Sequence, residues 1–418
     1  MDSSAAIFRR ESGRLVAALT RIFGVHQLAL AEDVVQDAFA RALEVWDAHG
    51  VPENPAAWLM TTAKNRALDI VRRERTARRF APEMGRLLET EWTLAPLIEE
   101  AFSAHAIRDG QLRMMFSCCH THLPEEAQLA LILNVLCGFG GQEIASAMLA
   151  SKAAVEKRLS RGKKLLASSQ RLFELSDSDF QARSTTVRRA LYLLFSEGYH
   201  GASDAPVRRE LCAEALRLTE LLLAHPAAAT PTTFALAALF CLHAARLPEK
   251  IDAAGDLNTL GDQDRSRWDA DLAAQGLHLL ERSAAGAELS GYHLEAAIAA
   301  VHVSARTLKE TDWAAIVELY DRLLGVAPSP VVALNRAIAI GERDGAEKGL
   351  AALDAIVDRD RLSAYPFYPA ALGEFELRRG NRSLARKHFE AARALSRNDA
   401  ERRFLDKRVQ ACSANDLH

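Results

Sequence analysis

The stretch that decides the fold is QEIASAMLASKAAVEKRLSRGKKLL, residues 142–166. Its apolar residues recur every three or four positions, which is typical of amphipathic helices. The residues from 143 to 149 predict a short helix, and Ser151 is a suitable N-cap for the helix that follows. Small Ala145 stands where two helices would cross closely, and Leu149 occupies the turn where glycine is common. The face of the second helix that we expect to be buried consists of Val155, Leu159, Gly162 and Leu166.

The opposite face of that second helix is basic. Residues 151–171 contain seven Lys or Arg and one Glu, a net charge of +6. Lys157, Arg161 and Lys164 form its outer stripe, again at a helical spacing. Two short helices with a basic second member are the organisation of a helix-turn-helix, whose second helix enters the major groove of DNA. The alternative interpretation is a solvated helix face without a partner.

A second basic segment lies upstream, KNRALDIVRRERTARR, residues 64–79. It has seven basic residues against two acidic ones, in a chain whose formal net charge is −3. The spacing predicts one helix over 55–79, with Leu59, Ala63, Ala67 and Ile70 buried. Its outer face would present Asn65, Asp69 and Arg72, flanked by Arg66 and Arg73, with Trp58 one turn earlier.

This set of side chains suits an opened DNA strand. Arginine forks bind phosphates, an amide recognises a base edge, and an aromatic ring stacks on an unpaired base. Two alternatives stand beside this interpretation. Trp58 is equally suited to a hydrophobic core, and Asp69 is placed to pair with the neighbouring arginines along the helix.

The composition is that of an ordinary globular protein. The chain has 418 residues, 49% hydrophobic and 26% charged, enough for two to four domains. No apolar run approaches the length that crosses a bilayer, and the N-terminus lacks an apolar signal core, so we expect a cytoplasmic protein without membrane partners. The six cysteines are expected to be reduced thiols.

Strand signals are nearly absent, so the sequence predicts an all-α protein. A larger helical region is expected from about 180 to 410. In the first part of the chain, the expected helices cover much of 4–22, 30–47, 55–79, 111–118, 124–137, 142–149 and 152–169.

Three segments, in this order, carry a family resemblance: AEDVVQDAFARALEVW (31–46), NPAAWLMTTAKNRALDIVRRERTARR (54–79) and the stretch 123–166. Together they closely resemble the extracytoplasmic-function class of bacterial sigma factors, over about residues 5–170. The resemblance implies four domains or segments. These are 1–80, sigma region 2, for the polymerase clamp and the −10 element; 81–110, a linker; 111–172, the helix-turn-helix of sigma region 4, for the −35 element; and 180–418, a C-terminal helical extension.

The resemblance also implies roles for individual residues. The partners would be core RNA polymerase, through its β′ clamp and β flap, and promoter DNA. Polymerase binding would fall to Asp33, Gln36, Asp37 and Arg41. The −10 element would be contacted by Trp58, Asn65, Arg66, Asp69, Arg72, Arg73 and Arg75. The −35 element would be contacted by Ser151, Lys152, Lys157, Arg158, Arg161 and Lys164.

The tail departs from the minimal form of this class. LYLLFSEGYHGASD (191–204), together with 114–139, resembles a subgroup that carries a long C-terminal helical extension. Its last part matches the spacing of a tetratricopeptide helix pair at Leu372, Gly373, Gly380, Ala385, Phe389 and Ala392, with Arg397 where proline is usual. Stacked pairs form a concave surface that binds a regulatory protein or peptide. The alternative is plain helix packing without a ligand.

Two clusters suggest chemistry but do not fit it. Cys118, Cys119, His120 and His122 offer zinc-binding atoms, yet adjacent cysteines do not share one tetrahedral ion easily. The segment 196–201 has Glu197, Tyr199 and His200 but no recognised catalytic motif around them. We therefore expect no enzyme activity, no metal and no cofactor.

The sequence supports an alternative sigma factor that directs promoter-specific initiation, with the extension regulating it in cis. A helix-turn-helix repressor or activator with an effector-binding tail is the main rival, but it leaves 31–46 and 54–79 without a role. A scaffold of helical repeats is a third hypothesis, and it leaves both basic faces unexplained.

Overall fold

The computed structural model describes residues 2–24, 27–79, 99–148, 150–168, 175–201 and 205–413. Over these residues the chain is helical, and the one extended pairing is an isolated bridge between Ile251 and Leu257. The all-α prediction is therefore confirmed. No helix in the described part is both long and apolar enough to span a bilayer. The chain divides into two compact units, one of residues 1–194 with 224–228 and one of 195–223 with 229–418.

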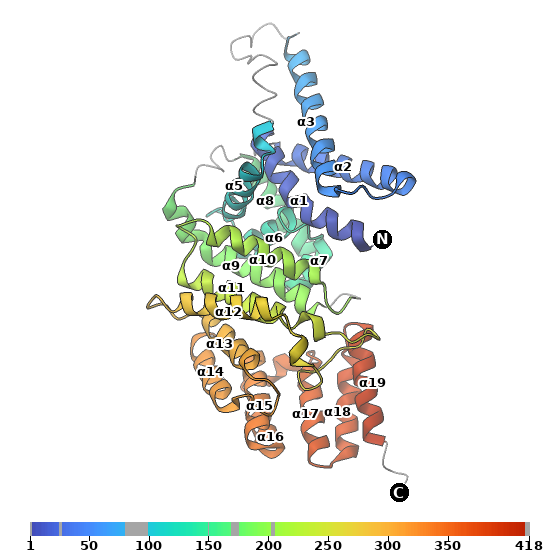
Figure 1. The fold of residues 1–418 in the computed structure, drawn as a ribbon, viewed down its shortest axis with the longest axis vertical. Helices are drawn as coiled ribbons and strands as arrows, with labels where there is room; N and C mark the ends of the chain where they lie inside the picture. The colour runs from blue at the N-terminus through green and yellow to red at the C-terminus, as the bar shows by residue number, and fades with distance from the viewer. Residues whose placement is uncertain are drawn as a thin grey trace. The chain divides into compact units, whose positions relative to one another are not determined.

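The helices of the first unit lie close to their predicted places (Figure 1). Helix α5 begins at Ala104, earlier than the expected 111, because the Ser103 hydroxyl caps it by accepting a hydrogen bond from the Ala106 amide at 3.2 Å. Much of the predicted linker 81–110 lies outside the described residues. The bounds are α1 Asp2–Phe23, α2 Leu28–His49, α3 Pro55–Arg79, α5 Ala104–Ser117, α6 Glu125–Val135, α7 Gly141–Ala147, α8 Lys152–Ser168 and α9 Asp177–His200, of which the last crosses into the second unit.

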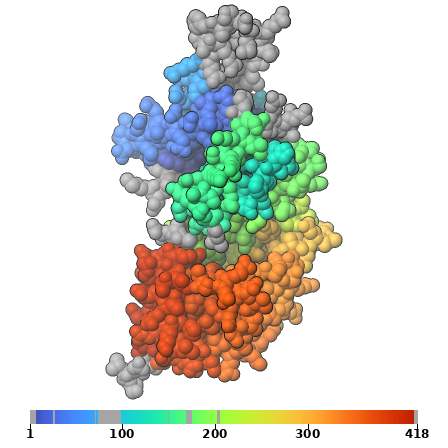
Figure 2. All heavy atoms as spheres, turned by 180° about the vertical axis from the view of Figure 1, so that it is seen from behind, coloured from blue at the N-terminus to red at the C-terminus, as the bar shows by residue number. Residues whose placement is uncertain are grey.

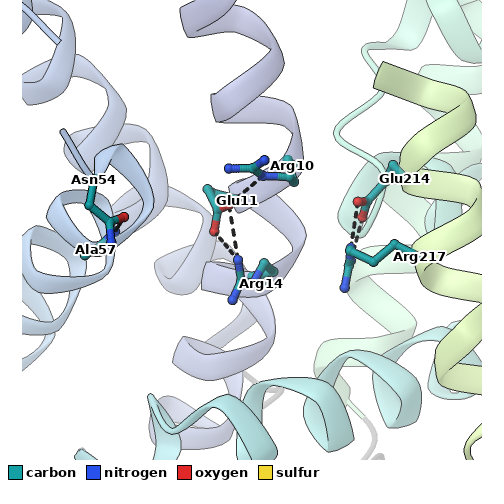
Figure 3. Close-up of polar contacts among 7 residues, drawn as sticks. All are labelled: Arg10, Glu11, Arg14, Asn54, Ala57, Glu214 and Arg217. Carbon is teal, nitrogen blue, oxygen red and sulfur yellow. Dashed lines mark hydrogen bonds and ion pairs between the residues drawn. The ribbon is translucent and has the colours of Figure 1, made fainter. Parts of the chain in front are cut away.

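Helix α1 is the centre of the first unit and packs against α2, α3, α5 and α6. Its residue Gly13 lies so close to the turn after α6 that an added Cβ would stand 2.2 Å from the Leu136 carbonyl oxygen. On the same helix, Glu11 is fully buried and accepts hydrogen bonds from Arg10 Nε and Arg14 Nη1, both at 2.9 Å (Figure 3). The buried charge is thus compensated within its own helix.

The second unit is a succession of helices in which each packs on the next (Figure 1). The C-terminal helices form one continuous packed body, coloured orange to red in Figure 2. The bounds are α10 Arg209–Leu223, α11 Pro231–Ala244, α12 Ala270–Ser283, α13 Gly291–Ser304, α14 Trp313–Val326, α15 Pro330–Asp344, α16 Ala346–Asp354, α17 Phe367–Arg378, α18 Arg382–Ala394 and α19 Asp399–Ser413.

Glycines and phenylalanines interlock the last helices of this unit. The Phe389 ring lies 2.9 Å from the position of a Cβ on Gly373, and the Phe375 ring lies within 2.6 Å of the Cβ positions of Gly341 and Gly349. Only glycine permits such close helix approach at these sites. The packing accounts for the pattern of small residues and phenylalanines in the sequence, while the tetratricopeptide-like character of the extension stays a prediction.

Candidate nucleic-acid interface

Helix α3 begins at Pro55 because its first turn is prepared by two residues. Proline has the backbone angle of a first helical position, and the Asn54 side chain accepts a hydrogen bond from the Ala57 amide at 3.0 Å (Figure 3). Leu59, Ala63 and Ala67 are then fully buried, as their spacing predicts, whereas Ile70, predicted to be buried with them, is only half-buried. This packing fixes which side of α3 faces solvent.

The solvent face of α3 carries most of the residues expected to contact the −10 element. Those with exposed side chains are Asn65, Asp69, Arg72 and Arg73. Arg66 is half-buried, and its Nε donates to Asp37 Oδ2 at 3.1 Å. The side chain of Arg75 lies outside the described residues. The face is thus basic and accessible, and one of its arginines is tied to α2.

Trp58 occupies a position between core and surface. It is half-buried, and its ring meets the buried Trp46 ring edge-on at a centroid distance of 5.6 Å. The indole is therefore held by packing on one side while part of it remains accessible. This arrangement combines features of the two interpretations that the sequence left open.

Helix α2 turns its predicted polymerase-binding residues to solvent. Val34, Val35, Ala38 and Ala42 are buried, so the helix has one well-defined inner face. The residues with exposed side chains on the other side are Asp33, Gln36, Asp37 and Arg41. A mixed acidic and basic surface therefore lies next to the basic face of α3, joined to it by the pair of Asp37 and Arg66.

Helices α7 and α8 form the predicted two-helix motif. The Ser151 hydroxyl accepts a hydrogen bond from the Ala154 amide at 3.3 Å and caps α8. Ala145 and Val155 are buried where the helices cross. At Gly162 an added Cβ would lie 2.7 Å from Leu131 Cδ1, so α8 packs tightly on α6. These contacts leave the opposite face of α8 free for a ligand.

That outer face is basic and largely exposed. Ser151, Lys152, Lys157, Arg161 and Lys164 are exposed, and Arg158 is half-buried. Lys152 lies 3.7 Å from Glu156. Within the part of the chain that the structure describes, no carboxylate forms an ion pair with Lys157, Arg158, Arg161 or Lys164.

Two ion pairs that the sequence did not predict join the helix-turn-helix to the N-terminal helices. Arg9 Nη2 lies 3.0 Å from Glu143 Oε1, and Lys163 Nζ lies 2.6 Å from Glu32 Oε1. A cavity of about 510 Å³ beside them is lined in part by Gln36. Because the partners of these pairs are 134 and 131 residues apart, no local sequence pattern predicts them. The one available signal was that Lys163 does not fall on the outer stripe of its helix.

The cysteines and histidines at 118–122 are not arranged as a metal site in the described structure. Cys118 and Cys119 are buried, and burial raises the pKa of the Cys119 thiol to about 12. Among the described residues, no group of three or more His, Cys, Asp or Glu side chains is arranged to bind a metal ion. Tyr199 and His200 lie in the second unit, at the end of α9.

Comparison with known proteins assigns the same regions. Residues 7–77 match the family Sigma-70 region 2, and residues 113–166 match Sigma-70, region 4. Residues 183–284 match a family of unknown function, DUF6596. The chain is 36% identical to an uncharacterized protein of Rhizobium meliloti (strain 1021) over 404 residues, which cover 96% of this chain and 93% of that protein.

The match to region 2 accounts for α2 and α3, which a simple helix-turn-helix regulator leaves without a role. The chain therefore contains region 2 and region 4 of sigma-70, the regions that bind core RNA polymerase and promoter DNA, and these imply a sigma factor that directs transcription initiation.

Proposed function

We propose that the chain is an alternative sigma factor of the extracytoplasmic-function class. In this proposal the exposed face of α2 binds the β′ clamp of core RNA polymerase. The outer face of α3 binds the opened −10 element, and that of α8 enters the major groove at the −35 element. The sigma regions would span residues 1–80 and 111–172, with 81–110 as their linker.

The observation that carries the proposal is the accessibility of both basic faces within one compact unit. Arg72 on α3 and Arg161 on α8 are exposed, while the opposite sides of both helices are buried. Had either arginine been buried in the fold, the helix could not have contacted DNA. The unpaired cations of α8 suit the phosphates that flank a major-groove site.

The composition of α3 supports strand opening in addition to duplex binding. Melting requires groups that capture an unstacked base and groups that hold the phosphates of the separated strand. Trp58 and Asn65 supply a ring and an amide, and Arg72 and Arg73 supply the phosphate-binding forks. We assign Asn65 to the non-template strand of the −10 element.

We further propose that the extension, residues 180–418, regulates this activity in cis. Support comes from α9, within which the two units divide, after Leu194. In the first unit, Phe180 stacks on Phe116 and on His225 at centroid distances of 4.5 and 4.2 Å. Arg183 donates to the Phe116 carbonyl at 3.1 Å. A change that shifts α9 would therefore reach the base of the region 4 helices.

The residue-level assignment is tested by Asn65→Ala in transcription reconstituted with core polymerase on a promoter library. We expect an altered −10 preference with unchanged polymerase binding. Gln410→Ala, which removes an exposed amide from α19, is the matched control. Loss of polymerase binding in Asn65→Ala would show that this face has another role.

The cis-regulatory part is tested by truncation. A cut at residue 180 would remove packed residues of the first unit, so the chain should end after Ala228, which keeps residues 224–228 and the His225 ring that stacks on Phe180. We expect the truncated protein to differ from the full chain in promoter output or in polymerase binding. Circular dichroism establishes that it is folded. Identical transcription by a folded truncated chain would rule out regulation by the extension.

A further inference from the structure

The second unit contains a cavity of about 250 Å³ that the sigma-factor function does not use. It lies where the end of α9, the loop that follows α11, and the starts of α17 and α19 meet. The side chains that matter for its chemistry are Tyr199, Lys250, Phe367, Arg397, Glu401 and Phe404. These residues come from distant parts of the sequence, from Tyr199 to Phe404, so no local motif revealed the cavity.

Lys250 gives the cavity its charge. Its Nζ lies 3.6 Å from the centre of the Tyr199 ring, a cation–π contact. No carboxylate of the described residues forms an ion pair with it. Burial, and then the positive charge of Arg246, lower the pKa of Lys250 to about 7. A half-buried ammonium without a counter-charge is costly, and an anion in the cavity would compensate it.

The other charges that line the cavity neutralise one another. Glu401 accepts hydrogen bonds from the Arg397 amide at 2.9 Å and from Arg397 Nε at 3.1 Å. The Arg397 guanidinium also stands over the Phe367 ring at 5.5 Å. Tyr199 is only 3% exposed, and its hydroxyl has no hydrogen-bond partner in the described structure. The uncompensated charge of the cavity is therefore the single one on Lys250.

The loop that carries Lys250 is held in place before any ligand arrives. The backbone N–H of Asn258 donates to the Lys250 carbonyl at 3.1 Å, and the side-chain Nδ2 of Asn258 donates to the Glu249 carbonyl at 3.0 Å. Asp256 pairs with Arg403 and Lys407 of α19 at 2.5 and 2.6 Å. A preformed site loses less freedom on binding, which favours affinity for a small ligand.

We propose that this cavity is a binding site for a small organic monocarboxylate. The Lys250 ammonium binds the carboxylate, and the rings of Phe367 and Phe404 contact its carbon body. The volume corresponds to about eight water molecules at ~30 Å³ each, which limits the ligand to a short-chain or single-ring acid. A single unpaired cation selects one negative charge rather than two. The site would make the extension a receptor for a metabolite-sized acid.

The charge of Lys250 makes binding dependent on pH. The titratable and charged groups around it are Tyr199 and His200 of α9, Cys212 of α10, His243 of α11, Arg246, and the pair of Arg397 and Glu401. The ligand binds the protonated lysine, and the carboxylate stays ionised above pH 6. As pH rises through about 7, the free site loses its proton, so the affinity falls by roughly tenfold per pH unit above that value.

The direct test is calorimetric titration of the full chain with sodium benzoate and sodium propionate, with benzamide as the uncharged analogue. We expect at least one acid to bind and benzamide not to bind. Lys250→Met, which keeps the apolar stem, should weaken binding at least about tenfold, whereas Lys387→Met on an exposed part of α18 should not. Equal binding by Lys250→Met, or no binding of either acid at millimolar concentration, would overturn the proposal.

A second measurement uses the unmodified protein and does not depend on the variant folding. Acetic anhydride at pH 7.5 labels unprotonated amines, and mass spectrometry gives the extent of labelling at each lysine. Benzoate should protect Lys250 and leave Lys387 unchanged. Labelling of Lys250 that is the same with and without benzoate would also contradict the proposal. Both tests omit polymerase, so their failure leaves the sigma-factor proposal intact.

The binding site itself does not depend on the proposed cis regulation. Its effect on transcription does, and that part of the inference rests on the proposed function. If benzoate binds, its effect on promoter output by the holoenzyme then tests whether the extension passes the signal on. That result bears on the regulatory role and not on the existence of the site.

Discussion

Helices α8 and α19 are both rich in basic residues, yet they differ in whether these residues form ion pairs. Every lysine and arginine of α19 has an acidic partner: Arg402 pairs with Asp399, Arg403 and Lys407 with Asp256, and Arg408 with Glu374. On α8, four cations have none among the described residues. Paired cations stabilise the packing of helices, whereas an unpaired row at a fixed spacing is available to a polyanion.

The comparison shows why a count of basic residues does not identify a DNA-binding helix. A sequence gives the number and spacing of charges but not their partners, because most partners of α19 come from other elements. The partners become visible only in three dimensions. Experiments that remove charge from one helix or the other can therefore separate the two roles.

The largest effect is expected from removing the four unpaired cations of α8 together, by Lys157→Gln, Arg158→Gln, Arg161→Gln and Lys164→Gln. Promoter binding by the holoenzyme should weaken about 1,000-fold at 150 mM salt, and the slope of log K against log salt should fall by about 3 to 4. Fluorescence anisotropy with labelled promoter DNA measures both quantities.

The control for this variant removes the same charge from the second unit, at Arg386, Lys387, Arg393 and Arg402. Its promoter binding should be close to that of the unmodified protein. If both variants lost the same affinity, net charge alone would explain the effect and the contrast between the two helices would be wrong.

The next effect concerns the buried side of α8. Gly162→Val should lower the free energy of unfolding by about 1–3 kcal/mol, because the new side chain overlaps Leu131 on α6. Urea denaturation measures the change. Gly345 provides a contrast, because an added Cβ there would meet no neighbouring atom and its φ of +94° is what favours glycine. Unchanged stability of Gly162→Val would mean that α8 does not pack on α6 as described.

Arg161, the neighbour of Gly162, faces the other way and should respond in the opposite manner. Arg161→Ala should leave folding stability unchanged and weaken binding to the −35 element. The loss should be about 1–3 kcal/mol if Arg161 contacts a base, or smaller with a reduced salt slope if it holds a phosphate. Binding to a series of −35 sequences distinguishes the two cases, and no loss on any sequence would remove Arg161 from the interface.

The smallest effect is expected on the side of α19. Glu374→Gln removes the partner of Arg408 and one partner of Arg378, which keeps Glu342. The pairs are partly exposed, so we expect a loss of about 0.5–1 kcal/mol in unfolding free energy that shrinks in high salt. Promoter affinity should not change. A large loss of DNA binding would contradict the structural role of these charges.

Much of the fold was predictable because apolar residues recur along the sequence at the spacing of a helix. Most of the buried residues of α3 and α8 and the cap at Ser151 follow from local rules, although Ile70 and Leu159, predicted to be buried, are only half-buried. The pair of Arg9 with Glu143 and the cavity around Lys250 did not, because they join residues distant in sequence. The start of α5 was missed because Ser103 and the helix after it lie beside a segment whose composition suggested a linker.

The interface itself was predicted in part. Spacing placed Asn65, Arg72 and Arg161 on outer faces, and the structure shows them exposed. Spacing alone did not indicate that Arg66 is held by Asp37, or that Lys163 belongs to an internal contact.

The central claim is that α3 and α8 contact one promoter at the same time. It is tested most directly by a photo-crosslinking amino acid placed at position 72 or at position 161, in holoenzyme bound to one labelled promoter. We predict crosslinks from position 72 to the −10 element and from position 161 to the −35 element of the same fragment. Crosslinks from either position to core polymerase alone, with none to DNA, would contradict the account.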